Sequence, residues 1–275
     1  MKAKITHLIS LAALGLLTAC GDGNVDNNTQ TAQTEAEAPQ KAIKLVDFEA
    51  SPDFPDARLA IKDIKTEMVN KDSVKITIHY AVDNYELKKQ TSAPAAGACN
   101  NSKDGQHIHF ILDNAPYVAL YQPEHSFVVP VNTSHYVMSF LSRSFHESLK
   151  NPEAGVLLKF SVDSKGVLKQ DELPNTPMLF YSRPKGDYVG DDTKNVLLDY
   201  YLYNASLAAS GTKVRATING NEFMLDEWKP LFIQNAPMGA MKVKLELIDQ
   251  DGNVLSGDNT SIEREVQLAG TEPVR

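Results

Sequence analysis

The chain has 275 residues, 42% of them hydrophobic and 23% charged, which is enough apolar content for one large or two modest folded domains. Removing Lys2 and Lys4, which belong to the N-terminal segment described next, leaves 25 basic residues against 35 acidic ones, a net charge of -10. This composition excludes disorder over most of the chain, and the acidic balance disfavours nucleic acid and anionic membrane surfaces as partners.

Residues 1–20 are typical of a bacterial secretory signal. Two lysines precede an apolar run that is too short to be a stable membrane span, and small residues follow it up to Cys20. The sequence LTAC at residues 17–20 resembles the lipobox of bacterial lipoproteins, whose cysteine is acylated and becomes the new N-terminus. The alternative is an ordinary cleaved signal. The residue after Cys20 is a glycine and not an aspartate, a pattern that resembles lipoproteins sorted to the outer membrane. We therefore expect a lipid anchor on Cys20 and a location in the cell envelope.

Residues 21–41 carry small and polar side chains with almost no large apolar residue, which predicts a flexible tether. From residue 42 onwards the chain consists of short apolar runs broken by turn residues, and residues 74–80 alternate as a strand does. No segment has a long apolar stripe at helical spacing. The pattern predicts an all-β fold built from immunoglobulin-like sandwiches.

An internal repeat refines this prediction. Residues 107–149 align without a gap on residues 213–255, and the preceding strand at 76–87 aligns on 196–207. Chance agreement between apolar β patterns is the alternative, but the ungapped run favours two copies of one unit. We therefore expect tandem β-sandwiches, the first over residues 42–170 and the second over residues 175–270.

The first copy carries an insertion of 14 residues, within residues 88–106, which contains Cys99. An extra loop on a rigid scaffold is a usual place for function. With Cys20 acylated, Cys99 has no disulfide partner in the chain. An unpaired thiol in an oxidising envelope calls for burial, a metal or a partner.

All six histidines after the signal belong to the first copy, and the second copy has none. On a strand, His107 and His109 share one face about 7 Å apart. The second copy has Lys213 and Arg215 at the aligned positions, so we expect this face to be exposed to solvent.

Neutral imidazoles on one face are suited to holding a metal ion. Three interpretations stay open at this stage: plain polar residues on an exposed strand, a metal site, or a site for an organic or peptide ligand. The metal hypothesis, with zinc or copper as the ion, combines His107 and His109 with Cys99 and with a further ligand from His135, His146 or Met138.

An enzyme is a further alternative. His107 and His109 with Asp113, followed by Asn132 and His135, partly resemble the two metal motifs of the cupins. The match lacks the framing glycines, has Asp113 where glutamate is usual, and has Asn132 where glycine is usual. We expect a non-enzymatic role and assign no catalytic residue, because no serine has the Gly-x-Ser-x-Gly context of a hydrolase.

Residues 141–148, with the sequence LSRSFHES, contain a second cluster of polar residues. Arg143 and His146 there could bind an anionic group such as a carboxylate or phosphate. The second copy has a plain turn at this place, so a solvated turn is the alternative.

Three segments of the chain carry a family resemblance: GQHIHFILDN at residues 105–114, LSRSFHES at residues 141–148 and LFYSRPKG at residues 179–186. Together they resemble a family of poorly characterised bacterial envelope lipoproteins. Some of its members are labelled phosphopeptide-binding proteins. The resemblance covers about residues 45–268 and implies a secreted β protein. We expect a lipid-anchored extracytoplasmic protein whose first sandwich binds a ligand, and a metal ion is the leading candidate for that ligand. The competing expectation is a structural or adhesive envelope module without a ligand site, and no protein partner is indicated.

Overall fold

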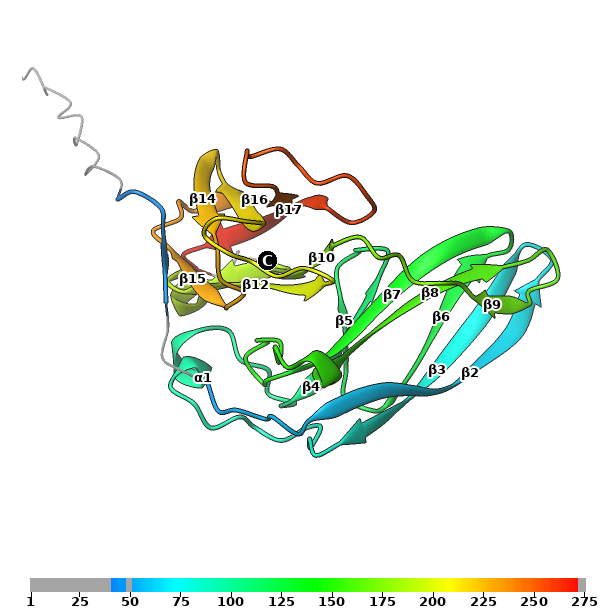
Figure 1. Ribbon diagram of the computed structural model, residues 1–275. Coiled ribbons are helices and arrows are strands. Elements are labelled where there is room, and N and C mark those ends of the chain that lie inside the picture. The colour runs from blue at the N-terminus through cyan, green and yellow to red at the C-terminus, as the bar shows by residue number, and fades with distance from the viewer. Residues whose placement is uncertain (1–40, 48–50, 272–275) are drawn as a thin grey trace, which may run out of the picture. The chain divides into compact units, whose positions relative to one another are not determined.

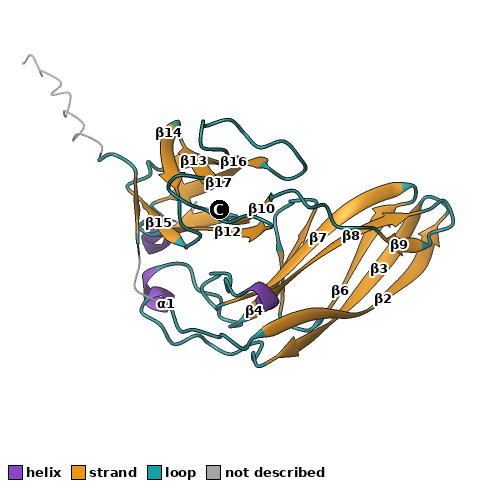
Figure 2. Cartoon of the chain, in the orientation of Figure 1, coloured by secondary structure: helices purple, strands orange, loops and turns teal. Residues whose placement is uncertain are grey.

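The structure is a computed structural model that describes residues 41–47 and 51–271, and their regular secondary structure is almost entirely β-strand (Figures 1 and 2). The predicted signal, Cys20 and nearly all of the predicted tether lie outside the described residues. Within the described ranges no helix is long and apolar enough to cross a membrane. The described residues belong to one compact unit, which contains two β-sandwiches.

The first sandwich forms because alternate residues of its strands are apolar. Val74, Ile76 and Ile78 of the smaller sheet are fully buried against Ile108 and Phe110 of the larger one. The smaller sheet has the strand order β2 (Arg58–Asn70), β3 (Ser73–Asp83) and β6 (Glu124–Pro130). The larger sheet has the order β5 (Val118–Leu120), β4 (His107–Leu112), β7 (Thr133–Ser142), β8 (Gly155–Val162) and β9 (Leu168–Gln170).

The second sandwich has the same plan and its own apolar core. One sheet has the order β1 (Lys44–Val46), β15 (Leu231–Gln234), β12 (Val196–Tyr203) and β10 (Met178–Arg183). The other has the order β11 (Asp187–Val189), β17 (Ser261–Ala269), β16 (Gly239–Ile248), β13 (Lys213–Ile218) and β14 (Asn221–Leu225). The predicted first sandwich began at residue 42, but β1 pairs with β15 and so belongs to the second.

The strand pairing confirms the prediction of two tandem copies. Ile108 of β4 pairs with Leu141 of β7, as Val214 of β13 pairs with Leu247 of β16. The predicted turn at residues 113–114 is also confirmed, since both residues have positive φ. The repeat even preserves the turn's hydrogen bonds: Asp113 accepts one from the Tyr136 backbone N–H at 2.8 Å, as Asn219 does from that of Lys242.

The outer face of the first large sheet packs against β10 and β12 of the second sandwich. This contact buries a shared apolar cluster and covers the face that carries the histidine pair. The expectation that this face is exposed was therefore wrong: His107 and His109 are both 0% exposed. The core of the cluster consists of Ile111, Tyr117, Met138, Phe140, Leu157, Met178, Phe180 and Tyr201.

The 14-residue insertion strengthens the same junction. It contains a short helix, α1 (Ala95–Ala98), from which Ala95 packs against Leu197 and Phe232 of the second sandwich. Asn100 donates a hydrogen bond to Asp192 at 2.9 Å. Short 3-10 turns lie at Pro152–Ala154 and Gly190–Thr193.

Candidate metal centre

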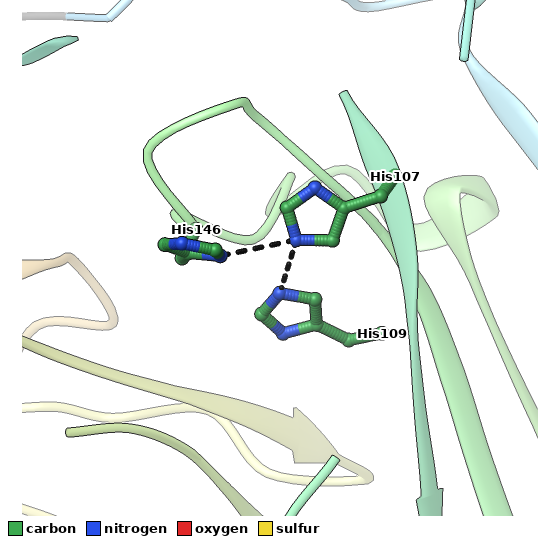
Figure 3. A group of neighbouring side chains, drawn as sticks. All are labelled: His107, His109 and His146. Carbon is green, nitrogen blue, oxygen red and sulfur yellow. Dashed lines mark hydrogen bonds between the residues drawn. The ribbon is translucent and has the colours of Figure 1, made fainter. Parts of the chain in front are cut away.

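Three imidazole rings converge where the first sandwich meets the second. His107 and His109 extend from one face of β4, and His146 reaches them from the turn after β7 (Figure 3). Their candidate donor atoms lie within 4.8 Å of one another. The Nε2 atom of His107 is 2.9 Å from Nε2 of His109 and 3.1 Å from Nδ1 of His146.

The hydrogen bonds around His107 determine where its proton lies. Its Nδ1 atom is 2.8 Å from the carbonyl oxygen of Gly105. A carbonyl can only accept, so a neutral His107 carries its proton on Nδ1 and has a lone pair on Nε2. Both neighbouring rings point a nitrogen at that one lone pair. Without a cation, each of these two nitrogens must either share that lone pair as an N–H donor or oppose it with a lone pair of its own. A cation between the rings lets each ring offer a lone pair.

The local backbone supports this arrangement at Gly105. This residue has φ +82°, and a Cβ atom there would collide with the carbonyl oxygen of Lys88. Only glycine suits such a position, and it aims its own carbonyl at His107.

His146 occupies a backbone position that also favours glycine. Its φ is +72°, and the second copy has Gly252, with φ +83°, at the matching point of the turn. A residue with a side chain costs about 1–2 kcal/mol in this conformation. Because the scaffold accepts glycine here, placing an imidazole has a stability cost, which indicates a role for the ring itself.

The spacing of the donor atoms fits coordination. Two nitrogens bound at about 2.0–2.1 Å to a tetrahedral zinc lie roughly 3.3 Å apart, so small movements of the rings would suffice. The outward nitrogens also have the partners that metal-bound histidines use: Gly105 for His107, and the Ser182 hydroxyl, 3.1 Å from Nδ1, for His109.

Burial keeps the three rings neutral, which is the form that binds metals. It lowers the pKa of His107 to about 4. Burial, together with the neighbouring imidazoles, Arg183 and Lys185, holds the pKa of His109 and His146 well below the ordinary value.

A pocket of about 360 Å³ meets the group of rings at His146, which lines it. Tyr117 forms its wall, with its ring stacked on His109 at a centroid distance of 3.6 Å and its hydroxyl 3.2 Å from Nδ1 of His146. Two cations of the second sandwich, Arg183 and Lys185, also line it.

Among the predicted metal ligands, His107 and His109 come together with His146, one of the alternatives for the further ligand, whereas Cys99 and His135 lie elsewhere. The Cys99 thiol donates to the carbonyl of Ala95 within α1, at 3.3 Å, and packs among apolar side chains with Phe145. Burial raises the pKa of this thiol to about 12. Its place is thus set by the packing of the insertion against the second sandwich.

His135 lies beyond the opposite end of β4. In the β4–β7 pairing His107 faces Ser142, whereas Leu112 faces Val137, so His135 is about 20 Å along the sheet from the histidine pair. Its Nδ1 contacts the carboxylate of Asp113 at 2.6 Å. The residues that resemble cupin motifs are therefore separated into two places.

The predicted anion-binding pair is also divided. Arg143 forms a buried ion pair with Glu147 at 3.1 Å and donates to the carbonyl of Pro52 at 2.6 Å, which occupies its guanidinium. His146 instead joins the histidine pair. Sequence reasoning did not identify Tyr117, Ser182 or Arg183 as neighbours of the site, although the last two stand in the LFYSRPKG segment.

Comparison with known proteins finds no matching family model and no matching curated protein. Among solved structures, the chain is similar to the fibronectin(III)-like modules of Clostridium thermocellum CbhA, with 9% identity and a TM-score of 0.25, over 78% of this chain and 98% of that one. It is also similar to the BSP domain of a biofilm-associated protein, with 10% identity and a TM-score of 0.21, over 81% of this chain. It spans 53% of that second chain.

Proposed function

We propose that this protein is a lipid-anchored, extracytoplasmic metal-binding protein of the bacterial envelope. Its first sandwich binds one transition-metal ion, zinc or copper, through Nε2 of His107, Nε2 of His109 and Nδ1 of His146. Imidazole nitrogens suit both metals. Lipid attachment at Cys20 and an outer-membrane location rest on the N-terminal sequence.

The observation that carries the metal proposal is the shared lone pair. Gly105 fixes the proton of His107 on Nδ1, and two further ring nitrogens lie 2.9 and 3.1 Å from its Nε2. A cation accounts for all three nitrogens at once. The second copy supports this, because it keeps the same strands and turn with no histidine in any of these positions.

The experiment is metal analysis and zinc titration by calorimetry on the mature soluble domain, purified without a histidine tag. We expect one zinc per chain and a loss of at least a hundredfold in affinity for His107→Ala, His109→Ala and His146→Ala. His135→Ala and Cys99→Ser are matched controls and should bind as the natural chain does. Zinc binding that survives all three triad substitutions, or that is absent from the natural chain, overturns the proposal.

A structural or adhesive module is the second candidate, and the junction favours it. The contacts of α1 and the shared apolar cluster hold the two sandwiches together, as a spacer requires. In that role the histidines would only fill the junction. The same titration decides between the two, because a spacer binds no stoichiometric metal.

The lipid anchor has its own test. Replacement of Cys20 by serine should move the protein from the membrane fraction of its host to the soluble fraction and abolish labelling with radioactive palmitate. Retention of the label in the serine variant would contradict acylation at Cys20.

A further inference from the structure

We propose that the metal centre is one half of a binding site for a small oxyanion, a carboxylate or phosphate group. One oxygen of this group occupies the open coordination position, and the others bind Arg183 and Lys185. This inference rests on the proposed metal site and names the chemistry of its ligand.

The first support is an arginine buried without a carboxylate partner. Arg183 is 6% exposed, and its Nη1 atom donates to the Tyr188 hydroxyl at 3.1 Å and to the Lys185 carbonyl at 3.3 Å. Its guanidinium also interacts with Tyr117, so its polar neighbours are hydroxyl groups and a carbonyl. Its Nε atom has no hydrogen-bond partner at all within the described part of the chain. Burying a charge is unfavourable unless a counter-charge offsets it. A missing anion would supply that counter-charge.

A second cation faces the same pocket. Lys185 is partly buried, and its Nζ atom donates to the Tyr117 carbonyl at 2.7 Å, with no carboxylate in ion-pair contact among the described residues. Asp187 stands at the rim with an exposed side chain and forms no ion pair with either cation in this part of the chain. Two unpaired cations lining one pocket are the pattern expected of an oxyanion site.

Tyr117 links the cations to the imidazoles. The Nζ atom of Lys185 is 4.2 Å from the centre of the Tyr117 ring, and Cζ of Arg183 is 5.4 Å from it. The same tyrosine contacts the proposed metal centre, since its ring stacks on His109 and its hydroxyl lies 3.2 Å from Nδ1 of His146. His146, Arg183 and Lys185 all line the pocket, so an oxyanion there would be within reach of both the cations and the ion.

The number of protein ligands agrees with this. Three histidines leave a fourth position of a tetrahedral ion free, as in sites that bind an exogenous molecule. The pocket reaches the triad at His146, and its volume of about 360 Å³ is that of a small-molecule site.

The test uses the full mature domain loaded with Co²⁺, whose visible spectrum changes when a new ligand enters its coordination sphere. Oxalate and inorganic phosphate, titrated separately, show whether carboxylate or phosphate is preferred. We expect at least one of them to shift the spectrum at saturable concentration. Arg183→Gln and Lys185→Gln should each weaken that anion at least tenfold. Lys213→Gln, which removes an equal charge from β13, should leave the affinity unchanged.

Zinc affinity is measured in the same variants, in a buffer free of both anions. Arg183→Gln and Lys185→Gln should bind zinc at least as tightly as the natural chain, because each substitution removes a cation near the ion. Anion binding that both variants retain, or a Co²⁺-loaded protein that neither anion perturbs, overturns the oxyanion inference and leaves the metal site standing. Anion binding to a chain that takes up no metal, lost in Arg183→Gln, overturns the metal site and keeps only the cationic half.

Discussion

The hydroxyl of Ser182 lies 3.1 Å from Nδ1 of His109, although the serine belongs to the second sandwich and the histidine to the first. The three proposed ligands therefore come from one copy of the repeat, while the group that orients one of them comes from the other. It follows that the proposed metal centre depends on the junction between the sandwiches.

Ser182→Ala should lower zinc affinity roughly tenfold, the lower end of the effect of removing an outer partner of a metal-bound histidine. The His109 ring loses the acceptor that fixes its proton on Nδ1. Competition with a chelator of known affinity measures the change. Ser134→Ala, an exposed serine of β7, is the control. Equal zinc affinity in the Ser182 variant would show that the hydroxyl does not orient the ring.

Zinc should raise the melting temperature of the soluble domain. An ion at a hundred times its dissociation constant stabilises the folded state by about 2.7 kcal/mol, or roughly 5–10 °C for a chain of this size. Differential scanning calorimetry with zinc and with a chelator measures the shift. His107→Ala should show none, and a shift of full size in that variant would place the bound ion elsewhere.

The metal-free protein should lose stability as the pH falls from about 6.5 to about 4. In this range the histidines of an unfolded chain, with pKa about 6.5, take up protons. The folded chain does not, because burial holds the pKa of His107 at about 4. The unfolded state therefore binds more protons, and the free energy of unfolding falls by up to about 1.4 kcal/mol per pH unit for each such histidine.

Urea unfolding at pH 7 and pH 5 in the presence of a chelator tests this. Glu147, whose pKa is raised by burial, changes stability in the opposite direction, so the natural chain is compared with His107→Gln. The variant should show the weaker pH dependence. An equal dependence in both proteins would mean that His107 does not contribute.

Phe180→Ala should destabilise the protein by about 3–5 kcal/mol and weaken zinc binding as well. Phe180 is fully buried in the junction cluster and lies two residues before Ser182 on β10. Chemical unfolding and zinc titration measure the two effects. Met224→Ala, at an exposed position of β14, should change stability by less than about 0.5 kcal/mol. Unchanged zinc binding in the Phe180 variant would show that the centre does not need the junction.

Local pattern was enough to predict much of the fold. Strict alternation of apolar and polar residues produced the all-β assignment, and a constant offset between copies produced the tandem repeat, because strand pairing preserves register. The turn at Asp113 was predicted from its counterpart at Asn219 for the same reason. The pairing of β1 with β15 was not predicted, because a strand of three residues is too short for its sequence to indicate which distant strand it pairs with.

The sequence by itself determined that imidazoles are confined to one copy and that His107 and His109 share one face of a strand, because both facts depend only on composition and on the two-residue period of β structure. Only the tertiary structure decided that this face is buried, that His146 completes the group in place of Cys99 or His135, and that Arg183 lies beside it. Those relations join residues up to 76 positions apart across a junction of two sandwiches. Packing of the apolar cluster sets that junction, and no local spacing encodes it.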